Sequence, residues 1–169
     1  MRDQRRWCMS LLLVAALVWP ATCGLAADGA KTNEAAKLRP VLCWYMVCFG
    51  NSVEGYRQEM ELAQRHGIDG FLLDVGAWEG NYVTSAERMY EAAKQLNTGF
   101  KLAMTPEYMC FFKENVLDMM KTVKDHPNQL RQDGRPVLGG YILDNTFKQA
   151  LLPVMKHLEE NGIKVFFVP

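Results

Sequence analysis

Ile68-Asp-Gly-Phe-Leu-Leu-Asp-Val75 is mostly apolar at both its odd and its even positions. A strand of this composition is buried on both faces, as are the strands of a parallel sheet that helices cover. The amphipathic segment before it ends at His66-Gly67, and a second amphipathic segment follows it and ends at Thr98-Gly99. These residues therefore predict a unit of strand, polar or aromatic turn, helix and stop.

The same unit recurs along the chain. Strands are predicted to begin near residues 41, 68, 100, 137 and 163, a period of roughly 26 to 37 residues that suits parallel βαβ crossovers. Alternation of this kind fits either a barrel or an open doubly wound sheet. Cys48-Phe-Gly-Asn-Ser52, after the first strand, has one glycine and lacks the Gly-rich phosphate loop of a dinucleotide fold. A barrel is therefore favoured.

The predicted helices differ in how well their ends are marked. Ser52 is expected to cap the first helix, and Thr84-Ser-Ala-Glu87 has the spacing of a capping box for the second. The third helix, around residues 116–123, ends before Pro127. For the fourth, Pro153 would break a helix interior, so this helix is predicted to start there, after a loop over residues 145–152.

A complete (β/α)8 barrel takes about 250 residues, whereas the fifth predicted strand, Ile163-Lys-Val-Phe-Phe-Val-Pro169, stands at the end of the 169 residues. The fold class predicted for residues 40–169 is therefore α/β, the N-terminal half of a (β/α)8 TIM barrel truncated at the fifth strand.

Residues 1–26 have the layout of a secretory signal peptide, with a basic start, an apolar run over Met9–Trp19 and small residues up to Ala26. The run is too short to span a bilayer. Residues 27–39 form a polar tether. A lipoprotein signal at Cys23 and a buried N-terminal helix remain alternatives. The expected protein is secreted or periplasmic, without a stable membrane span after cleavage.

Charge and cysteine content narrow the class of partner. The formal net charge is zero, and removal of the predicted signal peptide leaves a slightly acidic protein, so no nucleic-acid partner is expected. Three cysteines would remain in the mature chain; Cys43 and Cys48 are too far apart along one strand to pair, whereas Cys48 and Cys110 could. No spacing predicts a metal site, and no cofactor is expected.

In a barrel of this kind, the functional residues follow the carboxyl ends of the strands. Aromatic rings stack on sugar rings, and carboxylates bind sugar hydroxyls or handle the proton at a glycosidic oxygen. Each of these positions could instead have a structural role, as a helix cap, a loop anchor or a solvated loop charge. Tyr45 could be a core residue, and Trp44 is expected to pack under the helices. The candidate substrate contacts are Tyr45, Asp74, Trp78, Glu107 and Asp144.

Six short motifs recur in a fixed order along the part of the chain after the tether. They are Trp44-Tyr-Met-Val47, Leu62-Ala-Gln-Arg-His-Gly-Ile-Asp-Gly-Phe71, Phe100-Lys-Leu102, His126-Pro127, Asp133-Gly-Arg-Pro-Val137 and Val165-Phe-Phe-Val-Pro169. In this order they resemble glycoside hydrolase family 71, the endo-α-1,3-glucanases called mutanases, and share parts of the pattern with the family 99 endo-mannosidases and endo-mannanases.

The resemblance implies a barrel that hydrolyses internal α-1,3-glucosidic bonds with a pair of carboxylic acids. It places that pair in a Trp-Asn-Asp-x-x-Glu-like motif, which these 169 residues do not contain. The family also tends to have an aspartate after the third strand, where this chain has Thr105-Pro-Glu107. The sequence therefore predicts a secreted glycoside hydrolase fragment acting on α-1,3-glucan or a similar polysaccharide. The alternatives are a non-catalytic carbohydrate-binding barrel and a family 99-like mannan hydrolase.

Overall fold

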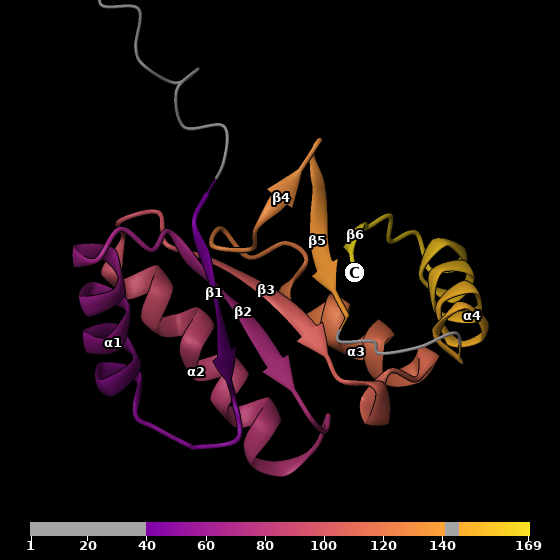
Figure 1. Cartoon of the computed structure of the whole chain (residues 1–169), viewed down its shortest axis with the longest axis horizontal. Helices are drawn as coiled ribbons and strands as arrows, with labels where there is room; N and C mark the ends of the chain where they lie inside the picture. Colours follow the sequence, from indigo (N-terminus) through magenta and orange to yellow (C-terminus); the bar gives the residue numbers. More distant parts are fainter. Residues whose placement is uncertain (1–39, 141–145) are drawn as a thin grey trace, which may run out of the picture. The chain divides into compact units, whose positions relative to one another are not determined.

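The computed structural model describes residues 40–140 and 146–169, with the side chains of residues 146–148 excepted (Figure 1). The predicted signal peptide, the tether and Asp144 lie outside the described residues. Five of the strands are parallel and pair in the order in which they occur along the chain. They are β1 (Leu42–Met46), β2 (Gly70–Val75), β3 (Lys101–Pro106), β5 (Arg135–Gly139) and β6 (Phe166–Val168).

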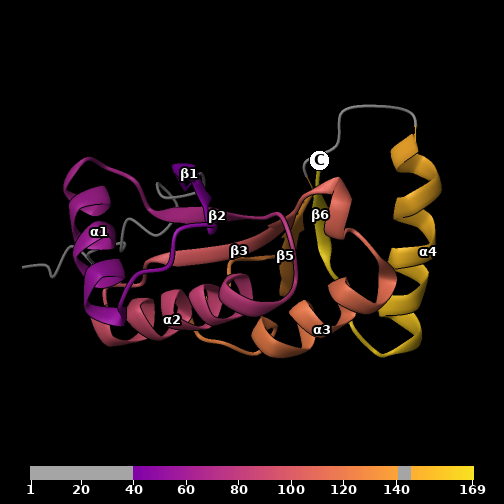
Figure 2. The same cartoon turned by 90° about the horizontal axis from the view of Figure 1, so that it is seen from below.

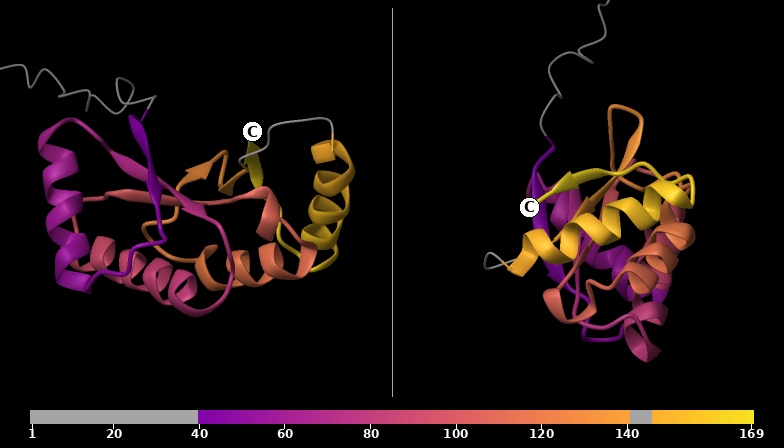
Figure 3. Two further views of the ribbon diagram at one scale, coloured as in Figure 1. Left: turned by 60° about the horizontal axis from the view of Figure 1, so that its bottom comes forward. Right: turned by 90° about the vertical axis from the view of Figure 1, so that its right-hand side faces the viewer.

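This sequential order distinguishes the two folds that the sequence leaves open. A doubly wound sheet reverses its strand order at a switch point, whereas here each parallel strand adds on the same side of the one before it, from β1 to β6 at opposite edges (Figure 3). The predicted α/β class and the parallel sheet are confirmed, and the order of the strands is that of a (β/α) barrel.

A short hairpin interrupts the parallel sheet. β4 (Arg131–Gln132) pairs antiparallel with the start of β5. Both turn residues, Asp133 and Gly134, have positive φ values, of 52° and 74°, as a tight hairpin turn requires. This hairpin was not among the predicted elements, although an Asp-Gly pair is a recognised signal for such a turn.

The helices pack on one face of the sheet. α2 and α3 lie along that face, while α1 and α4 flank it (Figure 2). Their bounds are α1 (Val53–Arg65), α2 (Gly80–Leu96), α3 (Lys113–Val123) and α4 (Thr146–Glu160), with a 3-10 turn η2 (Tyr108–Cys110) before α3. Alternate strand residues and the apolar stripes of the helices form the buried core between the two layers.

Trp44 and Tyr45 lie on opposite faces of β1, and it is Tyr45, not Trp44 as predicted, that faces the helices. Tyr45 faces the helices, where its ring stacks on Phe71 with the ring centroids 4.9 Å apart. Trp44 was expected to pack under the helices, but its side chain lies on the other face of the strand and is 47% exposed. When neighbouring strand positions are all apolar, the pattern of residues does not reveal which parity faces the helices.

The predicted cap of α1 is confirmed, and that of α2 is wrong. Ser52 Oγ accepts a hydrogen bond from the Gly55 backbone N–H at 3.0 Å. α2, however, begins at Gly80, and its N-terminal flanking residue Glu79 makes no side-chain cap. Thr84 therefore lies inside the helix, where its hydroxyl donates to the Gly80 carbonyl at 3.3 Å.

The start of α4 also differs from the prediction. The helix begins at Thr146, and Pro153 lies in its interior, so most of the predicted loop over residues 145–152 is helical. A proline at that position removes one backbone hydrogen bond. Buried Val154 and Leu158 attach the helix to the core, and this packing compensates for the lost bond. Tertiary contacts therefore override the local preference.

The three cysteines of the described residues are free thiols, so the possible pairing of Cys48 with Cys110 is not observed. Within the same residues, no helix has the length and apolar character that crossing a membrane requires.

Candidate functional site

The carboxyl ends of β2, β3 and β5 bring three residues into a row on the sheet face opposite the helices. Asp74 pairs in register with Thr105, and paired residues of neighbouring strands point to the same face. Gly139 stands on the other side of Thr105: a Cβ atom at that glycine would lie 2.7 Å from Thr105 Oγ1. The sheet therefore leaves room for the Thr105 side chain only because residue 139 has none.

Asp74 is the carboxylate of this row. Burial raises the pKa of its carboxyl above the ordinary value, and the negative charge of Glu107 raises it further. Its Oδ1 atom is buried and has no hydrogen-bond partner among the described residues. A partly buried carboxyl with an unused acceptor is suited to bind a hydroxyl group from outside the protein.

Glu107 lies beside Asp74 because the chain after β3 continues along the end of β2. Its backbone N–H donates to the Val75 carbonyl at 2.9 Å. A Cβ atom built on Gly76 would be 3.5 Å from Glu107 Oε1 and 3.2 Å from the Tyr82 hydroxyl. Gly76, like Gly139, thus leaves room for neighbouring side chains, here the Glu107 carboxylate and the Tyr82 phenol. Tyr82, on α2, was not among the predicted site residues.

Trp78 lies in the loop after β2 and is half-buried. Its indole Nε1 donates a hydrogen bond to Asp118 Oδ2 on α3 at 2.7 Å. Its N–H is therefore already engaged, and what it can offer a ligand is the face or edge of its ring. The loop-anchor role considered from the sequence is present, and it does not exclude a ring contact.

Tyr45 is not brought together with the other candidates. Its hydroxyl hydrogen-bonds to the Glu59 carboxylate on α1, and Asn51 Nδ2 donates to the other oxygen of that carboxylate at 2.8 Å. This network, on the helix face, ties β1 to the loop that precedes α1. Burial, together with the Glu59 carboxylate, raises the pKa of the Tyr45 hydroxyl above its ordinary value. Tyr45 is placed to support the loop.

Cys110 lies under the same edge but on the core side. Its Sγ donates to the Val75 carbonyl at 2.8 Å, and burial raises the pKa of the thiol to about 12. A neutral, buried thiol of this kind is a poor nucleophile and a poor metal ligand. Nowhere in residues 40–140 and 146–169 do three His, Cys, Asp or Glu side chains come together as a metal site would require.

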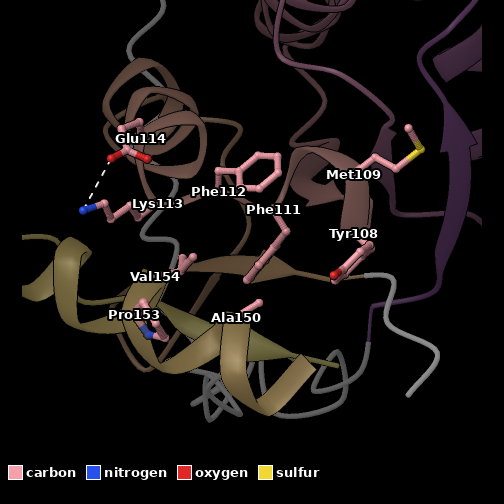
Figure 4. A pocket seen from close by; sticks show the side chains of 9 residues that line it. All are labelled: Tyr108, Met109, Phe111, Phe112, Lys113, Glu114, Ala150, Pro153 and Val154. Carbon is pink, nitrogen blue, oxygen red and sulfur yellow. Dashed lines mark ion pairs between the residues drawn. The ribbon is translucent and has the colours of Figure 1, made fainter. Parts of the chain in front are cut away.

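A pocket of about 520 Å³ lies next to this edge, between the η2–α3 segment and α4 (Figure 4). Tyr108 and Met109, which directly follow Glu107, are 55% and 75% exposed at its margin. On the opposite wall are Ala150, Pro153 and Val154 from α4. The surface is mostly apolar, with the Lys113–Glu114 ion pair at one side.

Residues 37–169 match glycosyl hydrolase family 71. The chain belongs to that family. It is 26% identical over 141 residues to a mutanase of Penicillium rubens, an alignment that covers 80% of this chain and 31% of the relative. The chain thus spans about a third of the length of that mutanase.

One solved structure agrees with this fold. A GH99 endo-α-mannosidase of Bacteroides thetaiotaomicron, bound to bis-tris-propane, superposes with a TM-score of 0.50 at 15% identity, over 63% of this chain and 42% of that one. A second structure of the GH99 endo-α-mannosidase from that organism gives a TM-score of 0.47 at 14% identity, over 63% and 46% of the two chains. The family 71 chain therefore has a barrel-like α/β fold, as its motifs predict.

Proposed function

We propose that this family 71 protein is a secreted glycoside hydrolase that acts on α-1,3-glucan or a similar polysaccharide. The observation that carries the proposal is that Asp74 and Glu107 come together at the carboxyl ends of β2 and β3, where burial and then the charge of Glu107 raise the pKa of the Asp74 carboxyl. Neighbouring carboxylates with a shifted pKa are common where a site must bind polar groups or handle protons. The apolar N-terminal segment supports the proposal of secretion.

Asp74 and Glu107 bind substrate hydroxyls in this scheme, because carboxylates accept strong hydrogen bonds from them. Trp78 offers its ring to the C–H face of a sugar, since Asp118 already accepts its N–H hydrogen bond. Asp144, in the segment outside the described residues, is proposed as a further contact. Tyr45 supports the loop after β1 through Glu59.

Hydrolysis needs one carboxylic acid to protonate the leaving oxygen and one carboxylate to activate water or to attack the sugar. We assign Asp74 and Glu107 to binding and leave those two roles to other residues of the enzyme. The separation of the catalytic pair then determines inversion or retention.

The test is to express the full-length protein and measure reducing-sugar release from α-1,3-glucan and from α-mannan. Release from glucan supports the proposal, and release from mannan alone moves the substrate to that of the family 99 type. Binding to either polymer without release would refute hydrolysis and identify a carbohydrate-binding protein.

Asp74→Asn then tests the site itself. It keeps the size of the side chain and removes the charge, so turnover should fall at least tenfold. The matched control is Asp125→Asn, an exposed carboxylate just after α3, which should leave turnover within twofold of wild type. Unchanged activity of Asp74→Asn would remove that residue from the site.

A further inference from the structure

Two buried side-chain oxygens at the carboxyl ends of the strands have no hydrogen-bond partner among the described residues: Asp74 Oδ1 and Thr105 Oγ1. Buried polar atoms in native proteins are nearly always satisfied by protein or by ordered water. An unsatisfied buried oxygen costs free energy, and two such atoms together indicate a binding site for a group that completes their hydrogen bonds.

The two oxygens lie on neighbouring strands and on one face. Asp74 and Thr105 are register partners of the β2–β3 pair, and the Thr105 side chain is 1% exposed. The Asp74 carboxylate accepts hydrogen bonds, and the Thr105 hydroxyl both donates and accepts them. A single O–H group between them can therefore donate to Asp74 while it accepts from Thr105.

Gly139, on the third strand, leaves the room that the Thr105 side chain occupies. Any side chain there would meet Thr105, since a Cβ atom would be 2.7 Å from Oγ1 and 2.8 Å from Cγ2. The Thr105 hydroxyl would then be displaced or its rotation blocked. A glycine at position 139 therefore lets the Thr105 side chain keep its place beside Asp74 in the row.

We propose that Asp74 and Thr105 together bind one hydroxyl group from outside the protein, with Thr105 as a specificity-determining residue of the site. The group is either a sugar hydroxyl of the substrate or an ordered water molecule, which present the same chemistry. The sugar assignment rests on the proposed function, whereas the water assignment does not.

Thr105→Val is the decisive variant, because valine has nearly the shape of threonine and lacks the hydroxyl. Thr105→Ser restores the hydroxyl and serves as the rescue. Thr122→Val is the matched control: the Thr122 hydroxyl donates to the Asp118 carbonyl on the exposed side of α3 at 2.9 Å, away from the row of residues at the strand ends. Urea denaturation of each variant establishes that it is folded.

The first readout needs no substrate. The Asp74 carboxyl is titrated by carbon-13 NMR in the free, full-length protein. If a water molecule links the two residues, Thr105→Val removes a hydrogen bond that favours the carboxylate, so the Asp74 pKa rises. Thr105→Ser and Thr122→Val should titrate like the wild type. A role of Thr105 in packing alone would leave the Asp74 pKa of Thr105→Val unchanged.

The second readout is the KM for α-1,3-glucan, or for α-mannan if that is the polymer cleaved. If the group is a sugar hydroxyl, Thr105→Val raises KM about tenfold, whereas Thr105→Ser stays within about threefold of wild type. A changed Asp74 pKa with unchanged KM identifies water, and a changed KM identifies the sugar.

The proposal is overturned if Thr105→Val alters neither the Asp74 pKa nor KM, or if Thr105→Ser does not return the altered quantity to its wild-type value. A protein that cleaves neither polymer would refute the proposed function, yet the NMR titration would still test the site.

Discussion

Trp78 Nε1 donates a hydrogen bond to Asp118 Oδ2 at 2.7 Å, although the two residues are 40 positions apart in the chain. The bond joins the loop after β2 to the middle of α3. It holds the indole against α3, so the loop and the helix are expected to be energetically coupled.

A double-mutant cycle of Trp78→Phe and Asp118→Ala measures this coupling. Each single change leaves the same hydrogen bond unmade, so the two effects on the free energy of unfolding should overlap by about 0.5–1.5 kcal/mol. Urea denaturation gives the values. The control cycle pairs Trp78→Phe with Glu87→Ala, a change at an exposed acid on α2 that Trp78 does not bind. The effects of these two changes on the free energy of unfolding should be additive. Additivity in both cycles would show that the Trp78–Asp118 bond contributes nothing.

Helix capping gives a second prediction, in which two similar residues should behave differently. Ser52→Ala removes the cap of α1 and should lower the free energy of unfolding by about 1 kcal/mol. Thr84→Ala removes a hydroxyl from inside α2 and should change it by less than about 0.5 kcal/mol. Denaturation midpoints of the two variants provide the comparison. An equally large loss for Thr84→Ala would mean that α2 begins near residue 84.

Crowding at the strand ends gives a third prediction. Gly139→Ala forces a methyl group against Thr105 and should destabilise the protein by about 1–3 kcal/mol. Thr105→Ala in that background removes the two crowded atoms and should recover part of the loss. Gly50→Ala is the control, since its Cβ would come no closer than 3.7 Å to Ser85 Oγ. If Gly139→Ala costs no more than the control, the close packing of β5 on Thr105 is refuted.

The raised pKa of Asp74 predicts how stability depends on pH. In the unfolded chain an aspartate titrates at about 3.9, and in the folded protein Asp74 titrates higher because of burial and Glu107. Between the two pKa values the folded state binds more protons, so the contribution of Asp74 to the free energy of unfolding falls as pH rises through this window. Below about pH 3.9 it is fully present.

Asp74→Asn cannot ionise and should therefore gain stability relative to wild type as pH rises from about 3.5 to 7. Urea denaturation at the two pH values measures the gain. Glu107→Gln removes the neighbouring charge and should lower the Asp74 pKa in the folded protein. The pH range between the folded and unfolded pKa values of Asp74 should then be narrower. A stability difference between Asp74→Asn and wild type that is the same at both pH values would contradict the assignment.

The alternation of strands with helices and the cap at Ser52 could be predicted from the chain alone. These features depend on interactions between residues close in sequence: apolar runs, helical periodicity and a side chain that reaches a backbone N–H three residues away. The family assignment could likewise be predicted from the order of short motifs. Asp74, Trp78 and Glu107 were placed at the strand ends for the same reason, because strand boundaries follow from local composition.

Tertiary packing determined the rest. Which side of β1 faces the helices depends on α1, whose Glu59 binds Tyr45, and not on the run of apolar residues in which Trp44 and Tyr45 stand. α4 continues through Pro153 because Val154 and Leu158 are buried against the core. The row of Asp74, Thr105 and Gly139 exists only once three strands lie side by side, since no residue of that row is near another in the chain. Hydrogen bonds and close contacts between residues far apart in the chain form only when the fold brings those residues together, so local sequence patterns do not predict them.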